Sequence, residues 1–199
     1  KIILTGGSGF AGRAFIAEIL QNTDWGIYSL GRSYGVVSDR LEKIYFDFTK
    51  PFEPGTEDAP AIKYFVHMGA AVHALGSLTD PGKFIQTNTV GTFNVLELAR
   101  KLKPELFVYI STAEVLGGIE SGYSAEDDQL RPSNPYAASK ACGELLTQTY
   151  QRCYGLPAIV CRSMNLFDFE TQTDESKFVP MVKKIIKDGG CVQIHTKNG

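Results

Sequence analysis

The fold class of this chain is decided by residues 2–12, which read IILTGGSGFAG. The apolar run at their start predicts a buried strand, and an amphipathic helix is predicted to follow, ending near Gln21. Gly6 permits a tight turn, Gly9 lets the backbone approach a pyrophosphate, and Gly12 lets helix and strand lie close together. This pattern predicts a βαβ unit that binds a dinucleotide at the helix N-terminus, and a glycine-rich turn without a ligand is the alternative.

Strand-like and helix-like segments alternate along the rest of the chain. We predict further strands at 26–30, 43–46, 62–66, 106–110, 158–162 and 191–195, and helices at 84–102, 135–153 and 178–187. This alternation predicts an α/β protein with a Rossmann-type, doubly wound parallel sheet and helices on both faces. We expect residues 1–162 to form the dinucleotide-binding domain and residues 163–199 to begin a small C-terminal substrate-binding part. We also expect both ends to be cut from a longer protein.

Composition excludes several classes of function. The 199 residues carry 20 basic and 22 acidic side chains, a net charge of −2, so no basic surface for nucleic acid is expected. Neither a membrane-spanning apolar run nor a signal peptide is apparent, which predicts no membrane partner and a cytoplasmic location. The four cysteines lack the close pairing of a zinc site, so we expect no metal and reduced thiols. His67 and His73 are expected to be structural.

The end of the second predicted strand bears on the choice of cofactor. An acidic residue there would bind the ribose hydroxyls of NAD. The sequence instead runs into Gly31-Arg32-Ser33. Because Arg32 can bind a 2′-phosphate, NADP is the predicted cofactor, with NAD as the alternative; an arginine in a surface loop would explain the same residue.

The segment NPYAASK, residues 134–140, predicts the first turn of a helix. Asn134 or Ser133 can cap it, and proline suits the first helical position. Tyr136 and Lys140 are four residues apart and share one helix face. We expect the ammonium to lower the pKa of the phenol, so that the tyrosine can exchange protons with a sugar or alcohol hydroxyl. An isolated pair of this kind also fits a solvated helix face.

Together these motifs resemble the extended short-chain dehydrogenase/reductase family, specifically its nucleotide-sugar epimerases and 4,6-dehydratases. The resemblance is carried by TGGxGFxG from Thr5, Asp47, HxxAA from His67, Asn88 before Gly91-Thr92, STxEV from Ser111, Tyr136 with Lys140, and Arg162 with Asn165. It implies a cofactor site formed by Gly6, Gly9, Phe10, Ala11, Gly12, Arg32, Asp47, Phe48, Met68, Gly69, Ala70, Tyr136 and Lys140, with Asp47 and Phe48 touching the adenine.

The resemblance also implies a nucleotide-diphosphate sugar as the substrate. Asn88, Thr112, Asn165 and Lys177 are its expected contacts. Thr171 and Asp168 depart from the arginine and glycine usual in the dehydratases, in the loop that contacts substrate. A homodimer formed by the helices at 84–102 and 135–153 is expected from the same source.

The choice within the family depends on Thr112-Ala113-Glu114. The resemblance makes Thr112, Glu114, Tyr136 and Lys140 the catalytic residues of a 4,6-dehydratase, with Glu114 removing the sugar C5 proton. Dehydratases of the family have Thr-Asp-Glu or Thr-Ser-Glu at these three positions. Here Ala113 takes the middle place, so the acid that assists departure of the C6 hydroxyl is missing. A 4-epimerase or sugar reductase, and a non-catalytic NADP-binding protein, remain the alternatives.

Overall fold

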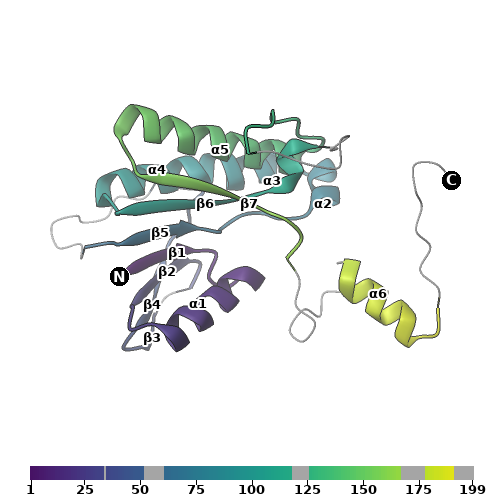
Figure 1. The fold of residues 1–199 in the computed structure, drawn as a ribbon, viewed down its shortest axis with the longest axis horizontal. Helices are drawn as coiled ribbons and strands as arrows, with labels where there is room; N and C mark the ends of the chain where they lie inside the picture. Colours follow the sequence, from purple (N-terminus) through teal and green to yellow (C-terminus); the bar gives the residue numbers. More distant parts are fainter. Residues whose placement is uncertain (34, 52–60, 118–125, 167–177, 191–199) are drawn as a thin grey trace. The chain divides into compact units, whose positions relative to one another are not determined.

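A computed structural model of the chain describes residues 1–33, 35–51, 61–117, 126–166 and 178–190. It contains a seven-stranded sheet in the order β3-β4-β2-β1-β5-β6-β7 (Figure 1). The strands are β1 (Ile2–Thr5), β2 (Ile27–Gly31), β3 (Gly35–Ser38), β4 (Leu41–Tyr45), β5 (Tyr64–His67), β6 (Leu106–Thr112) and β7 (Ala158–Ser163). All neighbouring strands are parallel except β3, which runs antiparallel to β4.

The helices connect the strands in the pattern of a Rossmann fold. They are α1 (Phe10–Asn22), α2 (Ala74–Thr79), α3 (Pro81–Phe84), the π-helix η1 (Ile85–Val90), α4 (Gly91–Leu102), the 3₁₀-helix η2 (Ala113–Leu116), α5 (Pro135–Tyr154) and α6 (Phe178–Lys187). The chain forms two compact units, Lys1–Met164 and Asn165–Gly199, and α6 belongs to the second. The sheet and the other helices form the first.

Helices lie on both faces of the sheet, as predicted (Figure 1). Side chains alternate along β1, so Ile2 and Leu4 pack in a cluster with α1, whereas Ile3 packs in a second cluster with α4. Phe65 and Phe107 extend that second cluster across β5 and β6. The fold class is therefore confirmed.

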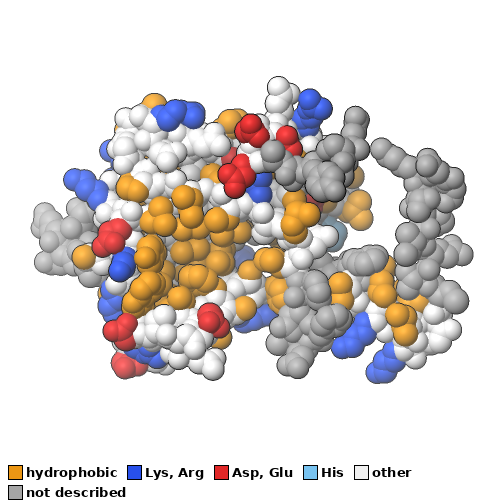
Figure 2. Space-filling view, viewed as in Figure 1, with side chains coloured by type: hydrophobic (Ala, Val, Ile, Leu, Met, Phe, Trp, Pro, Cys, Tyr) orange, Lys and Arg blue, Asp and Glu red, His pale blue; other side chains and the backbone are white. Residues whose placement is uncertain are grey.

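The face of the sheet against which α1 packs is not fully covered near β7. Val160 packs into the cluster on the α4 side, so Ile159 and Cys161 point the other way, and both are exposed. Figure 2 shows hydrophobic side chains gathered over the strands between α5 and α1.

Several elements differ from the prediction. The sheet is not wholly parallel, because β3 was not predicted and forms an antiparallel edge. The short helices α2, α3 and η2 were not predicted either, and the helix expected at 84–102 contains a π-helical turn at its start. The strand predicted at 191–195 lies outside the described residues.

The parallel order places the carboxyl ends of β1, β2, β4, β5, β6 and β7 at one edge. After β1 the chain moves to β2 on one side and later to β5 on the other. Such a switch point is where ligands bind in open α/β sheets.

Among the described residues, Cys142, Cys153 and Cys161 are free thiols, and no helix is long and apolar enough to cross a bilayer.

Candidate active site

The predicted phosphate site has the backbone geometry that its glycines require. Gly6 has a φ of 78°, which a residue with a side chain rarely adopts. A Cβ on Gly12 would collide with the carbonyl oxygen of Gly6, so helix and turn lie in direct contact. Gly9 precedes α1 without a side-chain cap, and the first turn holds no acidic residue. The first amides of α1 therefore remain free, which fits a pyrophosphate.

The turn after β1 lies directly against the segment after β5. A Cβ on Gly6 would lie 2.7 Å from the backbone nitrogen of Gly69. The ring of Phe48 lies against the backbone of Gly69 and Gly91, where a Cβ would come within 2.9 and 2.6 Å of it. This close approach leaves no room for side chains at the switch point. It fits a flat ligand lying across the strand ends.

Asp47 and Arg32 lie near each other where β4 and β2 end. The Asp47 carboxylate accepts hydrogen bonds from the hydroxyl of Thr49 at 2.7 Å and from its backbone amide at 3.2 Å. The Thr49 hydroxyl is the main reason that the pKa of Asp47 is lowered, and the charges of Lys50 and Arg32 act in the same direction. Arg32 is exposed directly after β2.

His67 is the centre of a buried hydrogen-bond chain. The amide of Gly69 donates to Thr5 Oγ1 at 3.0 Å, which leaves the Thr5 hydroxyl free to donate to His67 Nδ1 at 2.6 Å. His67 Nε2 lies 3.0 Å from the Thr92 hydroxyl, which itself donates to the carbonyl of Asn88 at 2.5 Å. Every donor is matched only if His67 is neutral and protonated on Nε2. Burial lowers the pKa of His67 to about 3, and the charge of Lys140 adds to this effect.

Asn88 lies in the π-helix and is 1% exposed. Its Oδ1 accepts from the amide of Ala71 at 2.7 Å. Its Nδ2 donates to the carbonyl of Ala71 and to Ser139 Oγ, both at 2.9 Å. These bonds use both amide hydrogens, so Asn88 joins the segment after β5 to α5 and has no free donor for a substrate.

Helix α5 begins as the sequence predicts. Asn134 is its N-cap, Pro135 is its first residue, and Tyr136 and Lys140 lie on its buried side. Lys140 is 4% exposed, and its ammonium donates to the carbonyl of Ile110 at 2.6 Å, above the ring of Tyr109 at 4.3 Å. Burial lowers the pKa of Lys140 to about 7, against the opposing effect of Glu144.

The expected effect of Lys140 on Tyr136 is not present in this structure. Burial raises the pKa of Tyr136, a hydrogen bond with Thr112 lowers it, and the charge of Glu114 raises it. The expectation was wrong because the ammonium is directed at the carbonyl of Ile110 and the phenol is largely buried.

Glu114 lies beside the start of α5. It sits in the 3₁₀-helix that follows β6, where Thr112 is the N-cap and its hydroxyl accepts from the Glu114 amide at 3.3 Å. The Glu114 carboxylate accepts a hydrogen bond from Asn134 Nδ2 at 3.1 Å. Thr112, Glu114 and Tyr136, three of the four predicted catalytic residues, are therefore brought together at the carboxyl end of β6.

Sequence reasoning missed Glu144, which lies one turn beyond Lys140. It is fully buried, and Arg162 of β7 donates to its two carboxylate oxygens from Nε at 3.1 and 3.2 Å and from Nη2 at 2.9 Å. The pair joins α5 to β7. The four-residue spacing from Lys140 was the signal in the sequence that could have indicated it.

A buried hydroxyl next to Thr112 also lacks a partner. Ser111 is 3% exposed, and its Oγ forms no hydrogen bond with the described residues. A buried polar atom without a partner is costly unless a bound group satisfies it. The residues at this edge of the sheet therefore fit a polar ligand.

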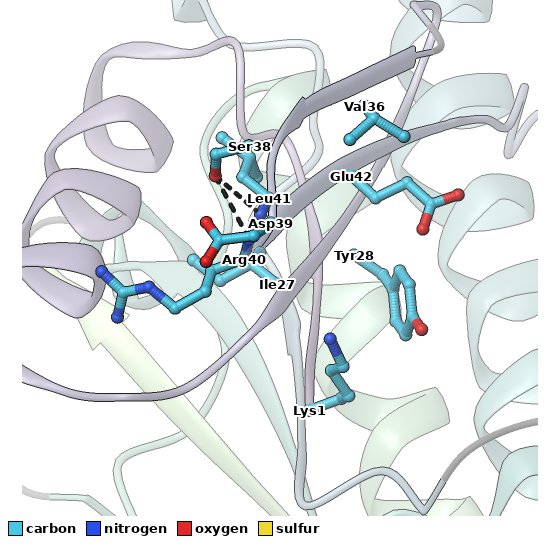
Figure 3. Close-up of a pocket in the computed structure, with 9 residues that line it drawn as sticks. All are labelled: Lys1, Ile27, Tyr28, Val36, Ser38, Asp39, Arg40, Leu41 and Glu42. Carbon is cyan, nitrogen blue, oxygen red and sulfur yellow. Dashed lines mark hydrogen bonds between the residues drawn. The ribbon is translucent and has the colours of Figure 1, made fainter.

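The cavity drawn in Figure 3 lies elsewhere. It has a volume of about 110 Å³ and is lined by Lys1, by the first residues of β2 and β4, and by Val36 and Ser38 of β3. Ser38 Oγ accepts there from the amides of Arg40 and Leu41 at 3.3 and 3.1 Å. This is the amino edge of the parallel strands, opposite the glycine turn, and it is not the predicted site.

Two of the predicted substrate contacts do not belong to the described residues of the first unit. Asn165 is exposed and belongs to the second unit. Lys177, with Thr171 and Asp168, lies outside the described residues. Met68 and Ala70 are half-buried in the segment after β5.

Relatives of known activity match almost the whole chain. A dTDP-glucose 4,6-dehydratase of Streptomyces antibioticus is 32% identical over 212 residues, covering 98% of this chain and 61% of the relative. Another of Neisseria meningitidis serogroup B is 34% identical over 218 residues, with the same coverage. The chain thus spans about three-fifths of the length of these relatives.

Solved structures share the fold. The dTDP-glucose 4,6-dehydratase DesIV of Streptomyces venezuelae, solved with NAD bound, superposes with a TM-score of 0.81 at 28% identity, over 95% of this chain and 62% of that one. A UDP-glucuronic acid 4-epimerase of Bacillus cereus, also with NAD, gives 0.78 at 21% identity, over 95% and 63%. Both hold NAD, so they do not support NADP as the cofactor. The NAD dependent epimerase/dehydratase family model matches residues 2–198, and the chain belongs to that family, within the extended short-chain dehydrogenases/reductases.

Proposed function

We propose that the full-length protein is a nucleotide-sugar 4,6-dehydratase. The observation that carries the proposal is the position of the Glu114 carboxylate, hydrogen-bonded to the residue that caps the helix of Tyr136. Thr112 lies at the same strand end, in contact with the same phenol. A carboxylate is a suitable base for the carbon-bound proton next to a ketone, and an epimerase has no need of it here.

A nicotinamide dinucleotide fits the carboxyl edge of the sheet. The free amides of α1 would bind its phosphates, and the segment around Gly69 and Phe48 would lie along it. When bound, this group would accept a hydride from the sugar C4 and return one to C6. NAD is the cofactor of the solved relatives, and Arg32 is the feature of this chain that favours NADP.

The residues of the chain divide the proton transfers between them. Tyr136 takes the proton of the C4 hydroxyl, Thr112 orients that hydroxyl, and Lys140 would hold the cofactor ribose. Glu114 then removes the C5 proton, which the C4 ketone has made acidic. Ala113 cannot donate a proton to the departing C6 hydroxyl, so Thr112 or a water molecule must do so.

We also propose roles for residues outside the catalytic group, and a location for the protein. Asn165 and Lys177 would contact the nucleotide-sugar side from the second unit, which would begin the substrate-binding part. Asn88 would act by positioning α5, because its amide is already bonded to the protein. We also propose a cytoplasmic location.

The test is Glu114→Gln in the full-length protein, with Tyr136→Phe as its comparison. Glu114→Gln should still oxidise C4 and accumulate reduced cofactor, yet fail to release water or to exchange the C5 hydrogen with solvent deuterium. Tyr136→Phe should instead slow C4 oxidation itself by about 10²–10⁴, the usual range for a general acid–base group. Absorbance of the reduced cofactor and mass spectrometry of the sugar measure the two steps.

A 4-epimerase is the second candidate, favoured by Ala113, which lacks the acid group. In that case Glu114→Gln would retain full activity and the wild-type product would contain no solvent deuterium. That result would overturn the dehydratase proposal.

A further inference from the structure

Asn134 makes two different hydrogen bonds at the start of α5. Its Oδ1 accepts from the amide of Ala137 at 2.8 Å, which is the helix cap. Because that bond needs the oxygen, the amide group can be oriented in only one way. Its Nδ2 must then face Glu114, whose carboxylate accepts at 3.1 Å. The capping hydrogen bond therefore fixes the direction in which Asn134 Nδ2 donates, which is toward the Glu114 carboxylate.

The backbone of Glu114 is held separately from its side chain. Its amide donates to Thr112 Oγ1, and its carbonyl accepts from the amide of Gly117 at 3.1 Å. The amide of Arg131 donates to the carbonyl of Val115 at 2.9 Å and closes the same turn. The Glu114 side chain itself is exposed and has three torsions beyond this turn. Its direction therefore depends on what hydrogen-bonds the carboxylate.

We propose that Asn134 is a positioning residue for removal of the C5 proton, because it holds the Glu114 carboxylate beside Tyr136. The two residues are 20 apart in the chain and meet only because β6 and α5 end and begin at one place. This inference rests on the proposed dehydratase function. It adds a residue that does not touch the substrate and acts through Glu114.

Substitutions at Asn134 can separate this role from helix capping. Serine and aspartate are about as good as asparagine at an N-cap. Serine is too short to reach Glu114, and aspartate places a second negative charge against it. Alanine loses both the cap and the donor. If Asn134 mattered only as a cap, serine and aspartate would behave like the wild type, and alanine alone would be impaired.

The experiment uses the full-length protein with a nucleotide sugar that the wild type converts. In Asn134→Ser, C5 deuterium exchange should slow about tenfold, the effect of losing one hydrogen bond to a charged group at a partly exposed site. Asn134→Asp should slow it further, to about a hundredfold, because like charges then repel. Single-turnover C4 oxidation and the melting temperature should stay near wild-type values in both. Asn134→Ala should also lower the melting temperature.

The outcomes separate this inference from the proposed function. If the wild type exchanges the C5 hydrogen, and Asn134→Ser and Asn134→Asp exchange it at the same rate, the proposed role of Asn134 is overturned. The proposed dehydratase function would then still stand. Equal slowing of C4 oxidation and C5 exchange would also overturn the role of Asn134, because a general distortion of α5 would then explain the effect. Absence of C5 exchange in the wild type would refute the proposed function and this inference together.

Discussion

Variants of Arg32 can test whether the protein prefers NADP or NAD. Arg32 is exposed after β2, and its charge reaches Asp47 across the strand ends. We predict that Arg32→Ala weakens NADP binding by about tenfold to a hundredfold, the effect of losing a charge-assisted contact to phosphate. NAD binding should stay unchanged, because NAD has no 2′-phosphate. Titration calorimetry of both cofactors measures this.

Arg32→Lys is the matched variant, since it keeps the charge and loses the planar donors. Its NADP affinity should lie between those of the wild type and Arg32→Ala. If the wild type binds NAD more tightly than NADP, and Arg32→Ala changes neither affinity, the arginine is an ordinary surface residue.

At the scale of single residues, the sequence predicted local features of the backbone and the spacing of side chains better than it predicted the surroundings of each side chain. The cap, the spacing of Tyr136 and Lys140, and the glycine turn follow from local rules and were confirmed. The pKa of Tyr136 was predicted in the wrong direction, because burial depends on neighbours distant in the sequence. The bond between Asn134 and Glu114 could not be predicted for the same reason.

At the scale of elements, His67 links β1, β5 and α4 as a neutral ring. Its folded-state pKa of about 3 lies below the usual 6.5. Between those values the unfolded chain binds a proton that the folded protein does not. The stability that depends on neutral His67 is therefore complete above pH 6.5 and is lost as the pH falls toward 3, by at most about 1.4 kcal/mol per pH unit.

Urea unfolding at several pH values measures this slope. His67→Gln should be less stable at neutral pH because it cannot make both bonds. Its stability should depend less on pH between about 4 and 6 than that of the wild type, since the titrating group is gone. Parallel slopes for the two proteins would show that other groups cause the loss.

The elements that were predicted are those with a buried face. The six parallel strands were found within about two residues at most ends, because their apolar side chains mark them. Strand β3 was missed because all four of its residues are exposed and so show no alternation. The π-helix was missed because its sequence differs from an α-helix only in hydrogen bonding, which periodicity does not report.

At the scale of the whole molecule, we predict a dimer formed through α4 and α5, which pack side by side (Figure 1). Phe93 on α4 and Leu145 on α5 are 44% and 51% exposed. Large apolar side chains exposed on neighbouring helices are typical of a surface that another copy covers. Replacing both with glutamate should convert the full-length protein to a monomer, measured by analytical ultracentrifugation at micromolar concentration.

Val36→Glu is the control, because Val36 is 76% exposed on β3, away from these helices. It should leave the dimer intact. A wild-type protein that sediments as a monomer would contradict the predicted assembly.

The central position of β1 has a consequence for how the chain folds during synthesis. Thr5 at the end of β1 bonds to His67, 62 residues later, and β5 is the partner that completes the middle of the sheet. Contacts between distant residues form slowly, because a long loop must close first. Until β5 leaves the ribosome, the apolar side chains of β1 lack that partner, and we expect chaperones to bind the emerging chain in this interval.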